Sequence, residues 1–285
     1  MSARLLMTAA ELAAEAPERT GPRAVVMTMG ALHEGHVELM REARRRVGSH
    51  GLVLLTVFVN PTQFAAGEDY DTYPRTLRTD VEMAGEAGVD VVFAPDAVEV
   101  YGPARGFTHD SVTVDAGPLG DILEGASRPG HFRGVLTVVA KLMGLTRPDV
   151  ALFGEKDYQQ LVLITRMVRD LSLPAQIIGV PTVREADGVA RSSRNRNLSE
   201  AERATARAVP RALEAAAAAA SAGAEAAVRA GRAAIDATPG VDLDYLAVTD
   251  VDLGPAPSTG PARILIAVRV GATRLIDNRA ATVGP

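Results

Sequence analysis

The sequence contains no cysteine among its 285 residues. Disulfide bonds, catalysis by a thiolate, zinc sites with cysteine ligands and iron–sulfur clusters are therefore excluded. No stretch reaches the roughly 18 consecutive apolar residues of a membrane-spanning helix, and the N-terminal segment lacks the apolar run of a signal peptide. We therefore expect a cytoplasmic protein.

Several familiar catalytic signatures are also missing. The chain has no Gly-x-x-x-x-Gly-Lys-Ser/Thr loop, and no Gly-x-Gly-x-x-Gly follows an apolar run. No order of Ser, His and Asp indicates a covalent nucleophile. Thirty basic against thirty-five acidic side chains leave a net charge of −5, which argues against a general nucleic-acid binder. A local site for a small phosphorylated ligand remains compatible with this charge.

What is present in the first two-thirds is an alternation of continuous apolar runs with helix-period segments. Hydrophobic residues make up 47% of the chain, as in ordinary globular proteins. Continuous apolar strands separated by helices predict a Rossmann-like, doubly wound parallel sheet of α/β class, covered on both faces. The expected strands are 24–29, 52–59, 90–94, 149–153 and 177–180, and the expected helices are 37–47, 78–88, 132–146 and 156–171.

The pattern changes after about residue 183. A polar segment leads to Ser199, a suitable helix N-cap with two glutamates in the turn that follows. An alanine-rich helix and strand candidates at 243–249, 263–269 and 273–276 come next. We therefore expect two domains: 1–182, a Rossmann-like nucleotide-binding domain, and 183–285, a smaller α+β C-terminal domain that covers the active site.

The strongest candidate site lies where the first strand meets a helix, around His33 and His36. Open α/β sheets bind ligands at this position, and a helix N-terminus attracts phosphates. Gly30 and Gly35 would let the backbone approach a nucleotide closely. Two ordinary surface histidines or two metal ligands are the alternatives, but the preceding strand and Thr-x-Gly make them less favoured.

A second strand end carries Gly154, Lys156, Asp157 and Gln160. A lysine at a helix start opposes the helix dipole, so Lys156 makes more sense facing a polyphosphate than as a solvent-exposed cap. Asp157 could hydrogen-bond a ribose hydroxyl or the lysine, and Gln160 lies one turn further on the same side.

Weaker signals complete the set. The Ser192–Asn195 loop offers hydroxyls and a guanidinium suited to phosphate, although such loops are commonly just solvated. Asn60 and Gln63 follow the second strand, and Arg128 and His131 flank a Pro-Gly pair before another helix. The candidate residues include cations and hydrogen-bond donors that suit phosphates, and neutral amides that suit a second ligand. This combination indicates nucleotidyl transfer, in which positioning and electrostatic stabilisation provide most of the rate.

These motifs in this order resemble those of pantoate–β-alanine ligases (pantothenate synthetases), a family of the His-x-Gly-His nucleotidylyltransferase group. The resemblance extends from about residue 24 to 283. The matching blocks are 28–36, 58–64, 73–77, Arg128 with His131 and Phe132, 153–160, 180–188 and 192–195. So many blocks in one order make a chance match very improbable.

The resemblance implies a two-step ligase reaction. The pantoate carboxylate attacks the α-phosphorus of ATP, giving pantoyl adenylate and pyrophosphate, and the amine of β-alanine then gives pantothenate and AMP. It further implies ATP with Mg²⁺, no tightly bound organic cofactor, no nucleic-acid or membrane partner, and a homodimer formed through the N-terminal domain, which would also bind pantoate.

The resemblance also assigns roles to individual residues. Catalysis falls to His36, usually labelled the proton donor, with His33, Lys156, Ser192, Ser193 and Arg194. ATP is bound by Met29, Gly30, His33, Gly35, His36, Gly154, Lys156, Asp157, Val183, Arg191, Ser192, Ser193 and Arg194. Pantoate is bound by Gln63, Gln160 and Arg128, β-alanine by Asn60 and Gln63, and a metal ion by Asp80.

Three positions depart from the family pattern. Met27 stands where proline is usual, Thr79 leaves Asp80 as the single member of an acidic pair, and Arg191 replaces a methionine beside the nucleotide loop. These departures keep open a paralogous ligase for another hydroxy acid or amine. Nucleotidyl transfer to a phosphorylated acceptor is less favoured, because Asn60 and Gln63 are neutral. A nucleotide-binding module without catalysis would not explain both histidines.

Overall fold

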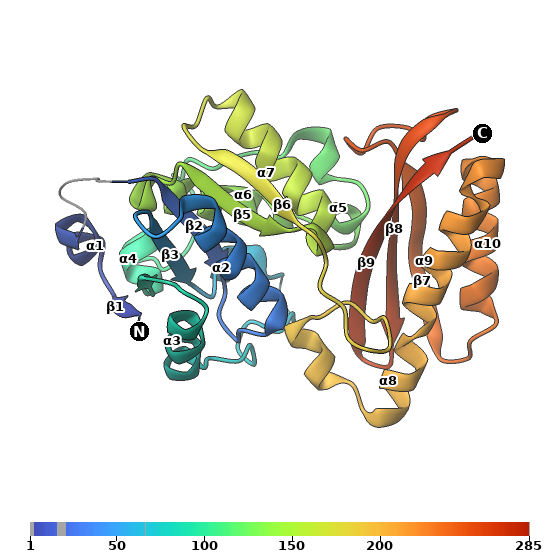
Figure 1. Ribbon diagram of the computed structural model, residues 1–285, viewed down its shortest axis with the longest axis horizontal. Coiled ribbons are helices and arrows are strands. Elements are labelled where there is room, and N and C mark those ends of the chain that lie inside the picture. Colours follow the sequence, from blue (N-terminus) through green and yellow to red (C-terminus); the bar gives the residue numbers. More distant parts are fainter. Residues whose placement is uncertain (1–2, 16–20, 66, 285) are drawn as a thin grey trace. The chain divides into compact units, whose positions relative to one another are not determined.

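The computed structural model describes residues 3–15, 21–65 and 67–284. The chain forms two compact units (Figure 1). The first comprises 1–155 and 163–180, and the second comprises 156–162 and 181–285. The short segment 156–162, which carries Lys156, therefore belongs with the C-terminal part of the chain.

The first unit is built around a six-stranded parallel sheet in the order β1-β4-β3-β2-β5-β6. Its strands are β1 (Arg4–Leu6), β2 (Arg23–Thr28), β3 (Leu52–Val57), β4 (Val91–Phe93), β5 (Val150–Gly154) and β6 (Gln176–Val180). Its helices are α1 (Ala9–Glu15), α2 (Glu34–Val47), α3 (Leu77–Glu86), α4 (Ala97–Tyr101), α5 (Glu124–Ser127), α6 (His131–Thr146) and most of α7 (Tyr158–Asp170). Short 3₁₀ helices occur at η1 (Pro61–Gln63) and η2 (Gly117–Gly120), and η3 (Glu155–Asp157) begins in the first unit and ends in the second.

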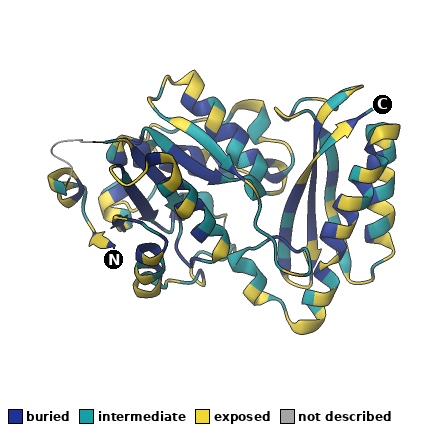
Figure 2. Cartoon of the chain, viewed as in Figure 1, coloured by how far each residue is buried: buried dark blue, intermediate teal, exposed yellow. Residues whose placement is uncertain are grey.

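The central strands are buried on both faces, which explains their continuous apolar character (Figure 2). Successive side chains of a strand point to opposite faces. Val26 of β2 belongs to the core that packs against α2, whereas Val25 faces the other way, and both are 0% exposed. Leu55 and Leu54 of β3 repeat this arrangement, also at 0% exposure.

The second unit contains a three-stranded antiparallel sheet in the order β7-β8-β9, formed by β7 (Val241–Thr249), β8 (Gly260–Val270) and β9 (Thr273–Val283). One face packs against α9 and α10 through an apolar core that includes Leu213, Ile235 and Ile266. The helical part consists of η4 (Ser193–Asn197), α8 (Glu200–Ala206), α9 (Ala208–Ala219), η5 (Ala220–Ala222) and α10 (Ala224–Asp236).

The structure confirms the predicted fold class, a parallel α/β sheet followed by an antiparallel sheet with helices. Ser199 caps α8 as expected, in a capping box with Glu202. The sequence pattern missed the short edge strand β1, and it ended β9 seven residues early, at residue 276. The helix expected from Ser199 onward is divided at Arg207 into α8 and α9.

The parallel sheet brings three chain segments to one edge. Strands β3, β2 and β5 are neighbours, and Val26 pairs with Leu55 on one side and Leu152 on the other. The chain passes from β2 to β3 on one side, while β5 lies on the opposite side. This is the topological switch point at which open α/β sheets bind ligands beyond the carboxyl ends of their strands.

Candidate active site

His33 and His36 form the N-terminal cap of α2. The His33 side chain accepts a hydrogen bond from the Gly35 N–H at 3.1 Å, and the His36 Nδ1 accepts one from the His33 N–H at 3.2 Å. Their ring centroids are 4.1 Å apart. This reciprocal cap satisfies backbone donors that the first turn of a helix leaves unpaired, and it fixes both rings at the carboxyl end of β2.

The same two hydrogen bonds determine where the imidazole protons lie. A backbone N–H can only donate, so Nδ1 of each ring must accept and cannot carry a proton. In the neutral tautomer Nε2 then carries it, and both rings are N–H donors at that atom. Two oriented donors at a helix N-terminus suit the developing negative charge on a phosphate.

Gly35 is required at this cap for steric reasons. A Cβ atom at Gly35 would lie 2.9 Å from Cε1 and 3.0 Å from Nδ1 of His33. Real Cβ atoms do not approach other atoms that closely, so any larger residue would displace the ring. The spacing His-x-Gly-His therefore follows from the geometry of the cap itself, in addition to the close nucleotide approach suggested by the sequence.

Asp80, from α3, fixes the turn that precedes the histidines. Its carboxylate accepts hydrogen bonds from the N–H groups of Ala31 at 3.1 Å and Leu32 at 2.9 Å, and from the Thr76 hydroxyl at 3.1–3.2 Å. Gly30 and Ala31 both have left-handed backbone conformations, with φ of 82° and 51°. Such a turn is strained at Ala31 and needs an external partner, which the Asp80 carboxylate provides.

These contacts do not fit Asp80 as a magnesium ligand. The side chain is 2% exposed, and both of its carboxylate oxygens accept backbone or hydroxyl protons. Within the described residues, no group of three or more His, Asp or Glu side chains is arranged to hold a metal ion. Mg²⁺ that accompanies ATP can instead be held by phosphate oxygens and water.

Asn60 and Gln63 lie after β3 as expected, and Asn60 orients Gln63. The Asn60 Nδ2 donates to the Gln63 Oε1 at 3.0 Å, and its Oδ1 accepts from the Tyr101 hydroxyl at 2.7 Å. The Gln63 Nε2 in turn lies 3.1 Å from the sulfur of Met29. Asn60 is only 1% exposed, whereas Gln63 is half-buried. The geometry therefore favours Gln63 as the amide that meets a ligand and Asn60 as its support.

Arg128 and His131 form a second polar group around the backbone of Gln63. Arg128 pairs with both carboxylate oxygens of Glu68 at 2.8 and 2.6 Å, and its NH1 lies 3.0 Å from the His131 Nε2. The His131 Nδ1 lies 2.8 Å from the Gln63 carbonyl oxygen. Since a carbonyl only accepts, Nδ1 carries the proton. Arg128 NH2 also donates to the Gln63 carbonyl at 3.4 Å, so both residues hold the Gln63 segment.

Burial and the Arg128 charge lower the pKa of His131 to about 4, although its hydrogen bond to the Gln63 carbonyl and the charges of Glu124 and Glu68 oppose this. His131 is therefore neutral near pH 7. Burial tends to raise the pKa of Glu68, but the hydrogen bond and charge of Arg128 outweigh it, so the pKa of Glu68 is lowered. The pair Glu68–Arg128 is thus ionised beside a neutral imidazole.

The second unit carries Lys156, whose ammonium lies 3.5 Å from a carboxylate oxygen of Asp157. The Lys156 side chain is 19% exposed. Gln160 is half-buried on the first turn of α7, while its neighbour Gln159 is buried at 3% exposure. Gly154 ends β5 in the first unit, with open space beside its α-carbon.

The phosphate-binding loop predicted around Ser192 follows a short hairpin. The Arg191 N–H donates to the Val183 carbonyl at 2.9 Å, and the Ser192 hydroxyl accepts from the Arg194 N–H at 3.3 Å as the cap of η4. The Nε of Arg191 is buried without a hydrogen-bond partner. The hydrogen bond between Arg191 and Val183 therefore fixes the backbone just before Ser192, Ser193 and Arg194.

The expected residues thus fall into two groups, each internally organised. The first unit holds Met29, Gly30, His33, Gly35, His36, Asn60, Gln63, Asp80, Arg128 and Gly154, and the second holds Lys156, Asp157, Gln160, Val183, Arg191, Ser192, Ser193 and Arg194. Sequence reasoning missed the supporting residues Glu68, Tyr101, Asp277 and Asn278. The strand expected at 273–276 continues through Asp277 and Asn278 as part of β9.

Comparison with known proteins shows the family to which this chain belongs. The family model for pantoate-beta-alanine ligase matches residues 4–280. A pantothenate synthetase from Saccharopolyspora erythraea is 57% identical over 93% of this chain and 86% of that protein, and one from Salinispora arenicola is 55% identical over 99% and 98%.

Solved structures agree with these relatives. The crystal structure of pantothenate synthetase from Thermus thermophilus matches with a TM-score of 0.90 and 47% identity, over 99% of this chain and 100% of that chain. The pantoate-beta-alanine ligase from Francisella tularensis, complexed with beta-gamma ATP and beta-alanine, matches with a TM-score of 0.79 and 32% identity, over 98% and 97%. Since the family model and the relatives cover nearly the whole chain, this protein belongs to the pantoate–β-alanine ligase family.

Proposed function

We propose that this protein joins pantoate to β-alanine at the expense of ATP, through a pantoyl-adenylate intermediate. The observation that carries the proposal is the reciprocal cap of His33 and His36, which presents two Nε2–H donors beside the switch point of the sheet. Membership of the family indicates which reaction the protein catalyses. The cap gives a physical reason why the charge of a phosphate is stabilised at the N-terminus of α2.

In the first step a pantoate carboxylate oxygen forms a bond to the α-phosphorus, and the bond from that phosphorus to the bridging oxygen of pyrophosphate breaks. Negative charge builds on the phosphate oxygens. The Nε2–H groups of His33 and His36 donate to them, and Lys156 with Ser192, Ser193 and Arg194 binds the departing pyrophosphate part. No protein carboxylate is assigned to Mg²⁺, because the contacts of Asp80 are incompatible with that role.

In the second step the amine nitrogen of β-alanine attacks the acyl carbon, and the bond from that carbon to the AMP oxygen breaks. The amine loses its proton to solvent or buffer. Gln63, oriented by Asn60, hydrogen-bonds pantoate and lies within the β-alanine subsite. A site that pairs hydroxyl groups discriminates against analogues that lack them, by roughly 10⁴-fold in favourable cases.

Three further assignments belong to the same proposal. Asp157, Gly154, Val183 and Arg191 bind the nucleoside and phosphates of ATP together with Met29, Gly30 and Gly35, and Gln160 and Arg128 assist pantoate binding. A homodimer formed through the first domain stays a prediction, which light scattering on the purified protein tests. Within the described residues, no helix is long and apolar enough to cross a membrane.

An omission assay tests the proposed reaction. The protein is incubated with ATP, Mg²⁺, pantoate and β-alanine, and the release of AMP and pyrophosphate is followed while each component is left out in turn. We expect pyrophosphate with pantoate alone and multiple-turnover AMP release only when β-alanine is added. Release that requires a different acid or amine would instead indicate a paralogous ligase.

Two variants test the assigned roles. His36→Ala and Lys156→Ala should each slow pyrophosphate release by about 10²-fold or more, because each removes a group that stabilises charge in the transition state. Neither should unfold the protein, since both side chains are partly exposed. Near-normal turnover in both variants would refute the roles given to them.

A further inference from the structure

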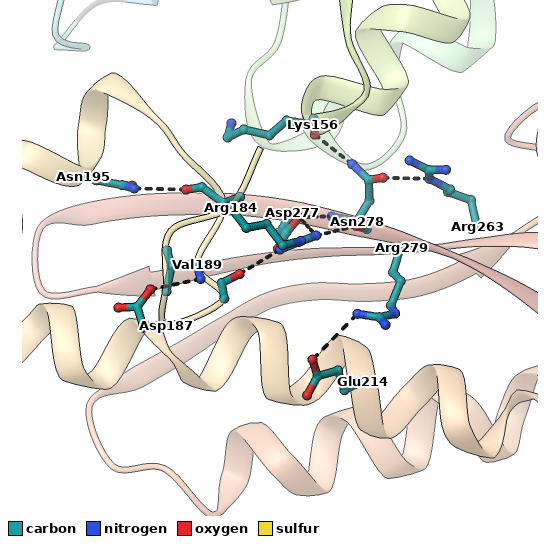
Figure 3. Close-up of polar contacts among 12 residues, drawn as sticks. Lys156, Arg184, Asp187, Val189, Asn195, Glu214, Arg263, Asp277, Asn278 and Arg279 are labelled. Atoms are coloured by element: carbon teal, nitrogen blue, oxygen red, sulfur yellow. Dashed lines mark hydrogen bonds and ion pairs between the residues drawn. The ribbon is translucent and has the colours of Figure 1, made fainter. Parts of the chain in front are cut away.

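Asn278, in the middle of β9, links the sheet of the second unit to the backbone of Lys156 (Figure 3). Its Nδ2 donates to the Lys156 carbonyl oxygen at 2.8 Å, and its Oδ1 accepts from the Nε of Arg263 at 2.7 Å. The carbonyl can only accept and the guanidinium can only donate, so the amide has one possible orientation. At 3% exposure this contact is shielded from water.

Arg263 holds the same segment at a second point. Its guanidinium carbon lies 4.0 Å from the ring centroid of Tyr158, two residues after Lys156, and the Tyr158 hydroxyl donates to the Val251 carbonyl at 2.9 Å. Arg263 is 9% exposed, and a cation over an aromatic ring in such a desolvated place is strongly attracted to it. The short segment from Lys156 to Tyr158 is therefore attached to strand β8 as well as β9.

The neighbouring residue, Asp277, holds the hairpin that leads to the Ser192 loop. Its carboxylate accepts from both terminal nitrogens of Arg184, at 2.6 and 3.0 Å, and the Asp277 side chain is 1% exposed. Arg184 also donates to the Gly188 carbonyl at 3.0 Å, which closes the hairpin on itself. A bidentate pair on a buried carboxylate is both strong and geometrically specific.

The hairpin has its own attachment to the loop it precedes. The Asn195 Nδ2 donates to the Glu185 Oε1 at 3.0 Å and to the Ala190 carbonyl at 3.0 Å. Burial tends to raise the pKa of Glu185, but hydrogen bonds from Arg203 and Asn195 outweigh it, so the pKa of Glu185 is lowered. The Ser193–Asn197 turn is thus tied to the hairpin, and the hairpin is tied to Asp277.

Successive side chains of a strand point in opposite directions, so two adjacent residues can hold two different segments. We propose that Asp277 and Asn278 are positioning residues that fix the Lys156 segment and the Ser192–Arg194 loop on one rigid strand. The inference rests on the proposed function, because it takes both segments to bind the triphosphate. Neither residue touches a substrate in this scheme. A misplacement of about 1 Å at a catalytic group can cost about 10²-fold in rate.

Asn278→Asp gives the sharpest test. The variant keeps the size of the side chain and an acceptor for Arg263, but it replaces the donor to the Lys156 carbonyl with a carboxylate oxygen. We expect single-turnover pyrophosphate release from ATP and pantoate to be about 10- to 100-fold slower. The attack of β-alanine on supplied pantoyl adenylate, from which pyrophosphate has already left, should keep its wild-type rate. A loss that affects both half-reactions equally would overturn the proposal.

A double-mutant cycle separates positioning from a general structural effect. If Asn278 acts through Lys156, then Lys156→Ala with Asn278→Asp should be no slower in pyrophosphate release than Lys156→Ala alone. Asp277→Asn should show the same non-additivity with Arg194→Ala. Additive losses in both cycles would overturn the proposal.

Two control variants complete the design. Arg279→Gln changes the next residue of the same strand, whose exposed side chain pairs with Glu214 at 3.8 Å (Figure 3), and it should behave like the wild type. Leu275→Val weakens the apolar face of β9 and calibrates the effect of lost stability alone. If wild-type protein releases no pyrophosphate from ATP and pantoate, the proposed function fails. If the wild type does and Asn278→Asp matches it, only this inference fails.

Discussion

Acidification should destabilise this protein through His131. The imidazole is held between the Arg128 guanidinium and the Gln63 carbonyl, with Glu68 and Glu124 nearby. Burial, aided by the Arg128 charge, lowers its pKa from 6.5 to about 4 in the folded state. The hydrogen bond to Gln63 and the two glutamates act in the opposite direction but do not balance these effects.

The size of the effect follows from that difference. In the unfolded chain His131 takes up a proton near pH 6.5, whereas in the folded protein it does so only near pH 4. Between these values the unfolded state binds more protons, so the free energy of unfolding rises with pH and falls on acidification. At about 1.4 kcal/mol per pH unit, the contribution lost between pH 6.5 and 4 is about 3 kcal/mol.

His131→Asn isolates this contribution. The asparagine Nδ2 can replace the Nδ1–H that meets the Gln63 carbonyl, but the side chain does not titrate. Urea unfolding of both proteins at several pH values should show a steeper fall of the free energy of unfolding for the wild type between pH 6.5 and 4. In parallel, NMR titration should show the His131 imidazole still neutral at about pH 5, and its signal should be missing in His131→Asn.

The outcome that would refute the reasoning is equally clear. If the free energies of unfolding of wild type and His131→Asn ran parallel from pH 7 to 4, the desolvated, neutral His131 would not exist. The same conclusion would follow if all five imidazoles titrated between pH 6 and 7. The Glu68–Arg128 ion pair would then have to be reinterpreted as the partner of a protonated histidine.

Three further changes test the neighbouring contacts. Gly35→Ala should slow pyrophosphate release at least about 10-fold, because its Cβ would displace the His33 ring, and normal release would contradict the steric argument. Asp80→Asn should lower the free energy of unfolding in urea by about 1.5–3 kcal/mol, since charge-assisted hydrogen bonds to the turn are lost, while the Mg²⁺ dependence of activity stays unchanged. A higher Mg²⁺ requirement would instead identify a metal ligand. Asn60→Ala should raise the KM for pantoate, and Gln63→Ala with Asn60→Ala should be no worse than Gln63→Ala alone; an additive loss would show that Asn60 acts independently.

The parallel sheet could be predicted because its signal is local and repeated. Continuous apolar runs such as 52–59 are typical of strands covered on both faces, and their alternation with helices indicates the α/β class. The edge strand β1 has three residues and an exposed side, so it carries no such pattern. The apolar pattern of the third C-terminal strand ends before Asp277 and Asn278, whereas β9 continues through both residues, each buried at 3% exposure.

The candidate site could be located for a similar reason. His33, His36 and Lys156 lie in the loops or first helical turns that follow apolar runs, and the carboxyl ends of parallel strands are where ligands bind. The role of individual atoms could not be predicted. That His33 and His36 are Nε2–H donors depends on backbone hydrogen bonds to Nδ1, which become apparent only when the cap is formed.

The residues that support the site share one property: each contacts another segment from far along the chain. Asp80 reaches the turn before His33 across 48 and 49 residues, Glu68 reaches Arg128 across 60, and Asn278 reaches Lys156 across 122. No periodicity or spacing records such a contact, because it exists only once the strands between the partners are packed. A buried carboxylate or amide must nevertheless find partners, since leaving it unpaired costs about 1–3 kcal/mol. Polar residues in the interior of a strand or at the buried face of a helix are therefore where supporting contacts of a site should be sought, even when their partners cannot be named from the sequence.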